Sequence, residues 1–294
     1  MRELIIRILG QESIAYQVIE KATSGFTNEV YFTDSMVIKI ASDEEKKKKL
    51  EKEIEIYKNI KLNNIPKYIA SGQIDNYLYL IISKVKGKGL YSVWHTLNNV
   101  ERESCVQQIA TTLEEFNKQN AMFLDEEYKL TDWEDFVIGK LKENKQGLEQ
   151  LGIDTRKLSD FIENNNLFKE NKYGLVYNDA HFDNFIFDNG TLSLIDFDRV
   201  VYAPLDYEML IFKTMCDNPS KFASEEDEDI VFDEDFTQVY DWFKKYYKEL
   251  FLIPNIDERV KVYQFNYLCG QALKMKNREI GDQWAKELVD GFDL

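Results

Sequence analysis

Apolar and polar positions alternate most clearly between residues 185 and 195, where two short apolar runs flank a turn. Residues 185–187 read FIF and residues 192–195 read LSLI, with the turn sequence DNG between them. Asn-Gly between alternating apolar residues is the strongest short-range signal for a β-hairpin, because both turn positions need a positive φ. The pattern therefore predicts a hairpin whose two outer ends lie close together.

The first 41 residues predict β structure, because short apolar runs alternate with polar, turn-prone segments. Strands are expected at residues 16–20, 29–33 and 36–41, and a longer apolar run predicts a further strand at residues 77–82. The first part of the chain is thus expected to be a small, mainly β unit.

A single helix is expected to interrupt this β region after residue 41. Ser42 followed by Glu45 has the form of a capping box, which marks a helix N-terminus. Leu50, Ile54 and Tyr57 recur at i, i+4 and i+7 and define the buried face of this helix. The remaining charged residues of the segment are expected to face solvent.

From about residue 90 onward the spacing of apolar residues becomes helical. Val106, Ile109, Leu113 and Phe116 form one stripe, and Pro204 with the acids after it is a typical helix start. Helices are expected around residues 106–116, from 131, at 157–167, from 204, and at 236–252, 257–274 and 278–289. The pattern predicts an α+β chain with a β-rich first part and a mainly helical remainder.

The composition agrees with a folded chain that does not span a membrane. Of 294 residues, 44% are hydrophobic and 14% aromatic, which suffices for a core, and no run of eighteen apolar residues occurs. The N-terminus lacks a signal-peptide cleavage pattern, so we expect a cytoplasmic protein. Three scattered cysteines and two histidines argue against disulfides and against a zinc or histidine-based metal site.

The net charge of −16 narrows the choice of partners. Proteins that bind nucleic acid carry a basic surface, so nucleic acid is not expected as a partner. An acidic cleft concentrates cations, so this charge permits a cationic small-molecule substrate. Solubility alone also explains the charge, and this alternative stays open.

Four polar side chains lie at the ends of the predicted hairpin. Asp179 and Asn184 precede it, and Asp196 and Asp198 follow it. Because a hairpin brings its outer ends together, oxygen-bearing side chains from both ends are expected to converge on one point. A small set of protein oxygens suits Mg²⁺, which keeps several waters and takes further ligands from substrate phosphates.

The spacing of these residues matches the kinase pattern D-x-x-x-x-N followed by D-F-G. The string NDAHFDNFIF, followed by LIDFDR, resembles the H-G-D-x-H-x-x-N and I-D-F segments of the aminoglycoside phosphotransferase and choline kinase family. The resemblance implies Asp179 as the catalytic base, Asn184 and Asp196 as Mg²⁺ ligands, and His181 as a residue that shapes the loop. A surface hairpin with incidental acids is the alternative.

The chain departs from the family pattern at three positions. Tyr177 and Asn178 replace the His-Gly pair, and Asp198 replaces the last glycine of D-F-G. Tyrosine before the catalytic pair also occurs in protein kinases. Asn178 is less usual there, so the backbone geometry at this position is left open.

The resemblance implies a two-lobed, protein-kinase-like α+β fold, with ATP or GTP and Mg²⁺ bound between the lobes. In the family, the strand at 77–82 leads to a hinge that binds adenine through its backbone, so Ser83 and Val85 are the expected contacts. We place the boundary there, with a nucleotide-binding lobe at residues 1–85 and a helical lobe carrying the catalytic loop at residues 86–294. A plain strand end with a glycine turn explains the same segment without the family.

Lys39 is flanked by Ile38 and Ile40 in an apolar strand, so its ammonium points away from both. This arrangement resembles the V-A-I-K strand whose lysine binds the α- and β-phosphates. At about 100° per residue, Glu53 lies roughly 60° from Leu50 on the following helix and is best placed to reach Lys39. Such a pair would fix the ammonium for phosphate binding, whereas a snorkelling surface lysine is the alternative.

A loop that covers the phosphates is expected in the turn-prone segment 22–28. Ser24, Gly25 and Asn28 resemble the Gly-x-x-Asn loop of the aminoglycoside phosphotransferases, in which side-chain and backbone donors cover the phosphates. An ordinary hairpin explains the segment equally well.

The expected function is transfer of a phosphate from ATP or GTP to a hydroxyl group of a small cationic molecule, with an aminoglycoside as first candidate. The acidic stretch 225–235 would form a rim that attracts a polyamine, and Asp198 and Asp206 are the nearest candidate substrate acids. The family resemblance also implies that Asp206 supports the catalytic loop from beneath. No tight aromatic cluster is evident in the sequence, which disfavours choline.

Several alternatives stay open. Choline, another amino alcohol or a sugar could be the acceptor for the same chemistry, and a nucleotide-binding pseudokinase acting through a protein partner is the non-enzymatic hypothesis. The acidic stretch is also explained as solvated surface. We expect a monomer that binds a nucleotide and a small molecule, with no nucleic-acid and no membrane partner.

Overall fold

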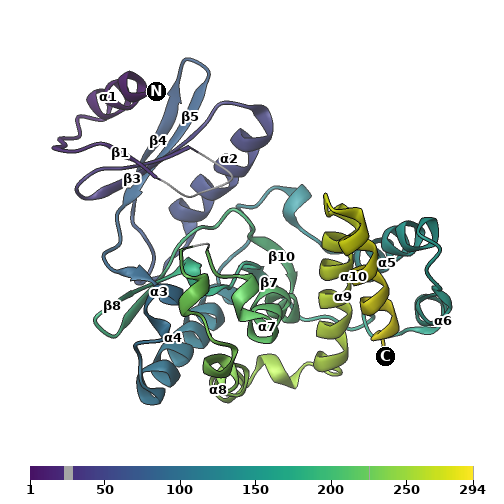
Figure 1. The fold of residues 1–294 in the computed structure, drawn as a ribbon. Helices are drawn as coiled ribbons and strands as arrows, with labels where there is room; N and C mark the ends of the chain where they lie inside the picture. Colours follow the sequence, from purple (N-terminus) through teal and green to yellow (C-terminus); the bar gives the residue numbers. More distant parts are fainter. Residues whose placement is uncertain (23–28, 225, 294) are drawn as a thin grey trace.

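The computed structural model describes residues 1–22, 29–224 and 226–293, and its chain forms two lobes (Figure 1). The N-terminal lobe holds a five-stranded antiparallel sheet with the strand order β1-β2-β3-β5-β4. Its strands are β1 (Glu20–Lys21), β2 (Glu29–Phe32), β3 (Met36–Ala41), β4 (Tyr68–Ile74) and β5 (Tyr77–Ser83). The strands expected at 29–33, 36–41 and 77–82 are confirmed to within one residue, whereas the strand expected at 16–20 is reduced to β1.

Helix α1 (Arg2–Gln11) contradicts the expectation that β structure extends over residues 1–41. Ile5, Ile8 and Leu9 are buried at helical spacing and pack in one cluster with Ile38 of the sheet. A helix satisfies this spacing because residues three and four apart share a face, whereas a strand would send Ile5 and Ile8 to opposite faces. The helical period of this short segment was missed.

Helix α2 (Glu44–Asn59) covers the opposite face of the sheet from α1, as the alternation of β3 requires (Figure 1). Ile38 and Ile40 belong to the cluster with α1, while Ala41 belongs to the cluster with Leu50 of α2. The helix itself is confirmed, but its cap is Asp43, whose carboxylate accepts the N–H of Lys46 at 2.9 Å. Ser42 is therefore not the cap that the sequence suggested.

The C-terminal lobe is mainly helical, as expected. Its helices are α3 (Leu90–Trp94), α4 (Asn99–Asn117), α5 (Trp133–Gln150), α6 (Arg156–Asn164), α7 (Met209–Asp217), α8 (Val239–Tyr246), α9 (Ile256–Lys274) and α10 (Arg278–Asp290). Short 3₁₀ turns are η1 (Glu126–Tyr128), η2 (Phe182–Asn184), η3 (Leu205–Glu208), η4 (Pro219–Lys221), η5 (Glu228–Ile230), η6 (Asp233–Phe236) and η7 (Leu250–Leu252). The helix expected at 236–252 is thus split into α8 and η7, and the one expected at 157–167 ends at Asn164. No helix in the described ranges is long and apolar enough to cross a membrane.

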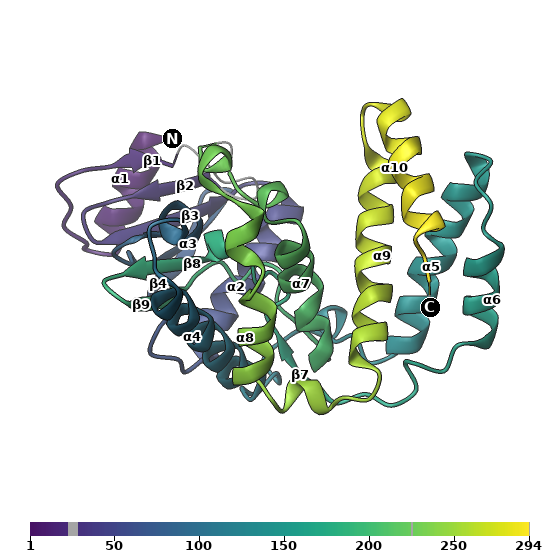
Figure 2. The ribbon, with the colours of Figure 1, turned by 60° about the horizontal axis from the view of Figure 1, so that its bottom comes forward.

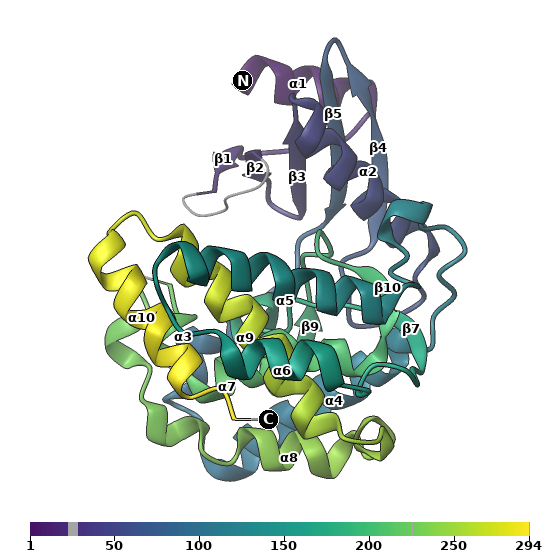
Figure 3. The ribbon, with the colours of Figure 1, turned by 90° about the vertical axis from the view of Figure 1, so that its right-hand side faces the viewer.

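Two small sheets complete this lobe. One pairs β7 (Tyr173–Val176) with β10 (Val201–Pro204), and the other joins β6 (Lys88–Gly89), β8 (Phe185–Asp188) and β9 (Thr191–Leu194). Helices α5, α6, α9 and α10 stand together at one side of the molecule, away from the N-terminal sheet (Figure 2). Figure 3 shows the N-terminal lobe standing above these helices and above α4.

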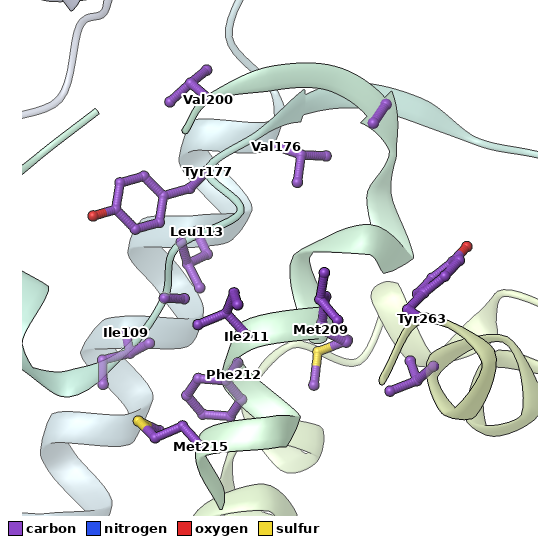
Figure 4. Close-up of a cluster of buried hydrophobic side chains, with 14 of the residues drawn as sticks. Ile109, Leu113, Val176, Tyr177, Val200, Met209, Ile211, Phe212, Met215 and Tyr263 are labelled. Carbon is purple, nitrogen blue, oxygen red and sulfur yellow. The ribbon is translucent and has the colours of Figure 1, made fainter. Parts of the chain in front are cut away.

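Helix α7 lies at the centre of the larger core and faces α4 and the end of β7 (Figure 4). Its side chains Met209, Ile211, Phe212 and Met215 are buried to within 1% of full burial. They pack in one cluster with residues from α4, from the end of β7 and the loop after it, and from the segment after the hairpin, namely Ile109, Leu113, Val176, Tyr177 and Val200. The loop between β7 and β8 therefore stands on a close-packed base.

The central hairpin is confirmed. It is formed by β8 and β9, and its turn residues Asn189 and Gly190 have φ values of 48° and 86°, the conformation that Asn-Gly adopts at least cost. Its outer ends meet, because the N–H of Ile195 donates to the carbonyl of Asn184 at 3.0 Å. Residues 179–184 and 195–198 are thereby brought to the same place.

Candidate active site

A cavity of about 610 Å³ lies between the N-terminal sheet and the hairpin, within the range of about 300–1,000 Å³ that is usual for ligand pockets. Its sheet side is apolar apart from Lys39 and Lys84, and its hairpin side carries most of the charged groups. It is lined by Val30, Phe32, Val37, Lys39, Tyr57, Pro66, Ile82, Ser83, Lys84, Val85, Gly87, Asp179, His181, Asp183, Asn184, Ile186, Ile195, Asp196, Asp198 and Arg199. We call this cavity the cleft.

Lys39 joins three parts of the chain inside the cleft. Its Nζ lies 2.6 Å from Oε1 of Glu53 on α2 and 2.9 Å from Oδ1 of Asp196 after β9. The Lys39 side chain is 11% exposed and the Glu53 side chain is fully buried. The contact between Lys39 and Glu53 that helical phase predicted is therefore confirmed.

The electrostatics of this cluster keep the ammonium charged. Burial alone would lower the pKa of Lys39, but Asp196 and Glu53 outweigh it and hold that pKa well above its ordinary value. Burial raises the pKa of Glu53 to about 7, against the opposing charge of Lys39. Lys39 thus presents a fixed positive charge at the floor of the cleft.

Asp179 lies in the loop between β7 and η2 and is held by three neighbours. Its carboxylate accepts from Nδ2 of Asn184 at 3.1 Å and from Nη1 of Arg199 at 3.2 Å, and lies 3.7 Å from Nε2 of His181. Burial would raise the pKa of Asp179, but His181, Arg199 and Asn184 together keep it below its ordinary value. The carboxylate is therefore ionised at neutral pH.

The Asn184 amide is oriented by the same loop. Its Nδ2 donates to the carbonyl of Asp179 at 2.9 Å as well as to the carboxylate, and lies 3.0 Å from Nε2 of His181. The amide oxygen is left for another partner, such as a cation. Within the described ranges no group of three or more His, Cys, Asp or Glu is arranged to hold a metal, so a metal here would depend on few protein oxygens.

The backbone before Asp179 is fixed by Glu208, which is fully buried. Its carboxylate accepts the N–H of Tyr177 at 2.9 Å and the N–H of Asn178 at 3.2 Å. Asn178 has a φ of 56°, a conformation that asparagine tolerates better than most side chains. Asparagine therefore stands in for glycine at this position without blocking the loop.

Asp206 does not have either role that the sequence suggested. It is fully buried, and its carboxylate accepts from Nε of Arg259 at 2.7 Å, from Nη2 of Arg259 at 3.0 Å and from the hydroxyl of Tyr263 at 2.7 Å. A carboxylate that accepts three hydrogen bonds inside the protein and is closed off from solvent cannot contact a substrate. The loop is supported by Glu208 instead, two residues further on.

The other predicted site residues are placed as follows. Ser83, Val85 and Asp198 line the cleft, whereas Ser24, Gly25 and Asn28 lie outside the described residues. Ser83 ends β5 beside the cleft, and its N–H donates to the carbonyl of Lys67 at 2.9 Å. Burial, then the carboxylates of Asp196 and Asp179, raise the pKa of Asp198.

Sequence reasoning missed Glu208, Arg199 and Asp183. Glu208 stands between Tyr207 and Met209, and an acid inside an apolar stretch was the available signal of burial with a partner. Arg199 follows the Asp-Phe-Asp string directly and lies beside Asp179. Asp183 lines the cleft next to His181, and burial raises its pKa.

An aromatic cluster was also missed. Trp133 and Phe136 of α5 pack against Tyr207 and Tyr263, with ring centroids 4.7–6.4 Å apart. A second cavity of about 140 Å³ lies beside it and shares Arg199 with the cleft. The sequence does not reveal this cluster, because its rings come from three distant segments.

Comparisons with known proteins bear on this arrangement. A family model described as "Phosphotransferase enzyme family" matches residues 18–245. No curated protein sequence matches the chain significantly.

Solved structures show a similar fold. The ADP-bound aminoglycoside phosphotransferase APH(2'')-Ib has a TM-score of 0.70 at 20% identity, covering 98% of this chain and 96% of that one. The GDP complex of aminoglycoside 2'-phosphotransferase-IIIa has a TM-score of 0.70 at 17% identity, covering 98% and 95%. A choline/ethanolamine kinase family protein from Mesorhizobium loti has a TM-score of 0.54 at 11% identity, covering 94% and 89%. The expected two-lobed, kinase-like fold is thereby confirmed.

We expect Asp206→Asn to lower the free energy of unfolding by about 3 kcal/mol or more, because it leaves the buried Arg259 guanidinium without its counter-charge. Urea denaturation measures this change. Asp198→Asn in the cleft serves as the matched control, and its effect should stay below about 1 kcal/mol. Equal stability of the two variants would contradict a structural role for Asp206.

Proposed function

Because the chain belongs to the phosphotransferase enzyme family, whose model matches residues 18–245, we propose that it transfers the γ-phosphoryl group of ATP or GTP to a hydroxyl group of a small cationic molecule. The observation that carries this proposal is the contact of Lys39 with Glu53 and Asp196 in the same cleft as Asp179. Structures of similar fold contain ADP or GDP, which supports a nucleotide as donor.

The nucleotide would bind with its base against the sheet side of the cleft. Val30, Val37 and Ile82 offer an apolar wall for a flat base, and the backbone of Ser83 and Val85 offers polar contacts at its edge. Lys39 would then bind the phosphates, with its ammonium held by Glu53. We place this lobe at residues 1–85 and the helical lobe at residues 86–294. Ser24, Gly25 and Asn28 remain proposed phosphate contacts.

Asn184 and Asp196 would hold Mg²⁺, since both offer oxygen and leave further positions to water and phosphate. When bound, the ion neutralises charge on the phosphates as it develops. Asp196 is suited to this because its side chain remains 44% exposed while Lys39 engages one oxygen. The chemistry of these donors therefore fits the ion.

Asp179 would orient the acceptor hydroxyl and take up its proton. The hydroxyl oxygen attacks the γ-phosphorus in line, and the bond from that phosphorus to the β-phosphate oxygen breaks. Arg199 and His181 favour this role because they keep Asp179 ionised. We place the reaction in the cytoplasm, where both nucleotides are available, and propose that the protein acts as a monomer.

An aminoglycoside is the first candidate acceptor. Asp183 and Asp198 line the cleft, and burial raises the pKa of both carboxylates, an effect that the charge of an acceptor ammonium beside them would oppose. Asp227 of the acidic stretch adds charge near Asp183 and accepts from Ser92 at 3.0 Å. Asp235 is instead occupied by Arg102 at 2.7 Å, so only part of the stretch favours a polycation.

A neutral sugar is the second candidate. The small cavity beside the aromatic cluster is lined by Phe136, Tyr207 and Tyr267 together with Arg199 and Lys140. Aromatic faces suit the apolar face of a sugar ring, whereas two cationic side chains disfavour a quaternary ammonium in the same place. This observation favours a sugar over choline as the alternative acceptor.

We expect Asp179→Asn to lower kcat by about 100-fold or more while nucleotide affinity changes little, because the base is lost and the cleft is kept. Nucleotide turnover should be measured with ATP or GTP, Mg²⁺ and a panel of aminoglycosides, choline and sugars. Asp188→Asn, an exposed acid in the hairpin turn, is the control. A folded Asp179→Asn variant that turns over at the parent rate would remove Asp179 from the mechanism.

The KM of a polycationic acceptor should rise steeply with salt, because charge pairs at the cleft mouth are screened over about 10 Å at 0.1 M ionic strength. KM should be measured at low and moderate salt with nucleotide saturating, and the KM of a neutral sugar gives the comparison. A flat response, or turnover with neutral sugars alone, would exclude the polycation and leave the phosphotransferase assignment standing.

A further inference from the structure

Two adjacent residues of helix α2, Lys52 and Glu53, contact the same segment of the other lobe. Glu53 Oε1 accepts the N–H of Phe197 at 3.5 Å, and Lys52 Nζ donates to the carbonyl of Val200 at 3.0 Å. The helix therefore touches both ends of residues 197–200. Glu53 belongs to the cluster with Lys39, whereas Lys52 has no part in the chemistry proposed above.

The position of the Lys52 ammonium is unusual for a lysine. Lys52 is 8% exposed, and its Nζ lies 4.3 Å from the centroid of the Tyr128 ring in η1. Burial lowers its pKa to about 8, although Asp198 and Glu53 oppose this shift. An apolar side chain would fill the same space without the cost of desolvating a charge. The contacts of the ammonium with the Val200 carbonyl and the Tyr128 ring are therefore what a lysine adds at this position.

Val200, whose carbonyl accepts the Lys52 hydrogen bond, is anchored in the C-terminal lobe. The Val200 side chain is fully buried in the core of the C-terminal lobe (Figure 4), and its N–H donates to the carbonyl of Phe197 at 3.4 Å. Between these two residues, Arg199 reaches the carboxylate of Asp179 at 3.2 Å. A shift of α2 against residues 197–200 would therefore disturb both Glu53 and the neighbour of Asp179.

We propose that Lys52 is a positioning residue, whose ammonium holds helix α2 against the C-terminal lobe so that Glu53 stays within reach of Lys39. The inference rests on the proposed function in so far as it assigns Lys39 to the nucleotide phosphates. Lys52 acts only through α2 and the segment 197–200. Its removal should therefore impair use of the nucleotide more than binding of the acceptor.

The first test compares Lys52→Met, which keeps the length of the side chain and removes the ammonium, with the parent. A hydrogen bond from a charged donor is worth enough to lower kcat/KM for the nucleotide about tenfold or more. KM for the acceptor should change less than kcat/KM for the nucleotide, because Lys52 reaches the proposed acceptor groups only through the charge of Asp198. Lys52→Arg, which keeps charge and donors, should restore part of the loss. Lys48→Met, an exposed lysine of the same helix, should behave like the parent.

The second test asks whether Lys52 acts through Glu53. In a Glu53→Gln background, Lys52→Met should have little further effect on kcat/KM for the nucleotide, because coupled residues are not additive. Full additivity, or a Lys52→Met variant within twofold of the parent, would overturn the proposal. A loss that falls equally on nucleotide and acceptor would show a general structural role instead.

A third measurement does not depend on activity. Amide hydrogen exchange of Phe197 and of residues 198–200 should become faster in Lys52→Met and unchanged in Lys48→Met, while exchange in β4 and β5 stays the same. Tyr128→Leu, which removes only the ring beside the ammonium, should act in the same direction and replaces Lys52→Met if that variant does not fold. Unchanged exchange in both variants would overturn the proposal. If the parent protein shows no turnover, the proposed function is contradicted. Faster exchange in Lys52→Met would still support the positioning role of Lys52.

Discussion

The candidate site depends on one lysine ammonium that is removed from water and held between two carboxylates. Lys39 reaches Glu53 at 2.6 Å and Asp196 at 2.9 Å, although these acids lie 14 and 157 residues further along the chain. Burying an ammonium is costly unless it is well paired. The need to pair this ammonium therefore holds the sheet, helix α2 and the hairpin in one arrangement. The alternation of side chains along β3 allows the pairing, since Ile38 and Ile40 face α1 and Lys39 faces the cleft.

A second constraint comes from beneath, in the core of the C-terminal lobe. Glu208 binds the backbone of Tyr177 and Asn178, and the Tyr177 hydroxyl donates to the carbonyl of Ile195 at 2.6 Å. The loop before Asp179 is thus tied both to η3, which precedes α7, and to the end of the hairpin. Glu208 is fully buried, and this burial raises its pKa to about 7. The placement of Asp179 follows from these backbone contacts as much as from its own side-chain partners.

Much of this site could be predicted where the signal is local. The Asn-Gly turn fixes the hairpin, and the helical phase of α2 selects Glu53 over its neighbours as the partner of Lys39. The features that the sequence did not predict correctly depend mostly on packing between distant segments. Spacing alone cannot tell that Asp206 is saturated by Arg259 while Glu208 supports the loop. The aromatic cluster joins residues 133, 136, 207 and 263, which no single stretch of sequence reveals. Helix α1 was missed although its spacing was helical, because its apolar residues were taken for a strand.

The most direct test of this account is a double-mutant cycle of Lys39→Met and Glu53→Gln, read as nucleotide affinity by titration calorimetry. If Glu53 acts by holding the Lys39 ammonium toward the phosphates, each single variant should weaken binding. The double variant should then bind about as weakly as Lys39→Met alone, because the interaction is already lost. Losses that add in full would show that the two side chains act separately, which would contradict the central role of the shared ammonium.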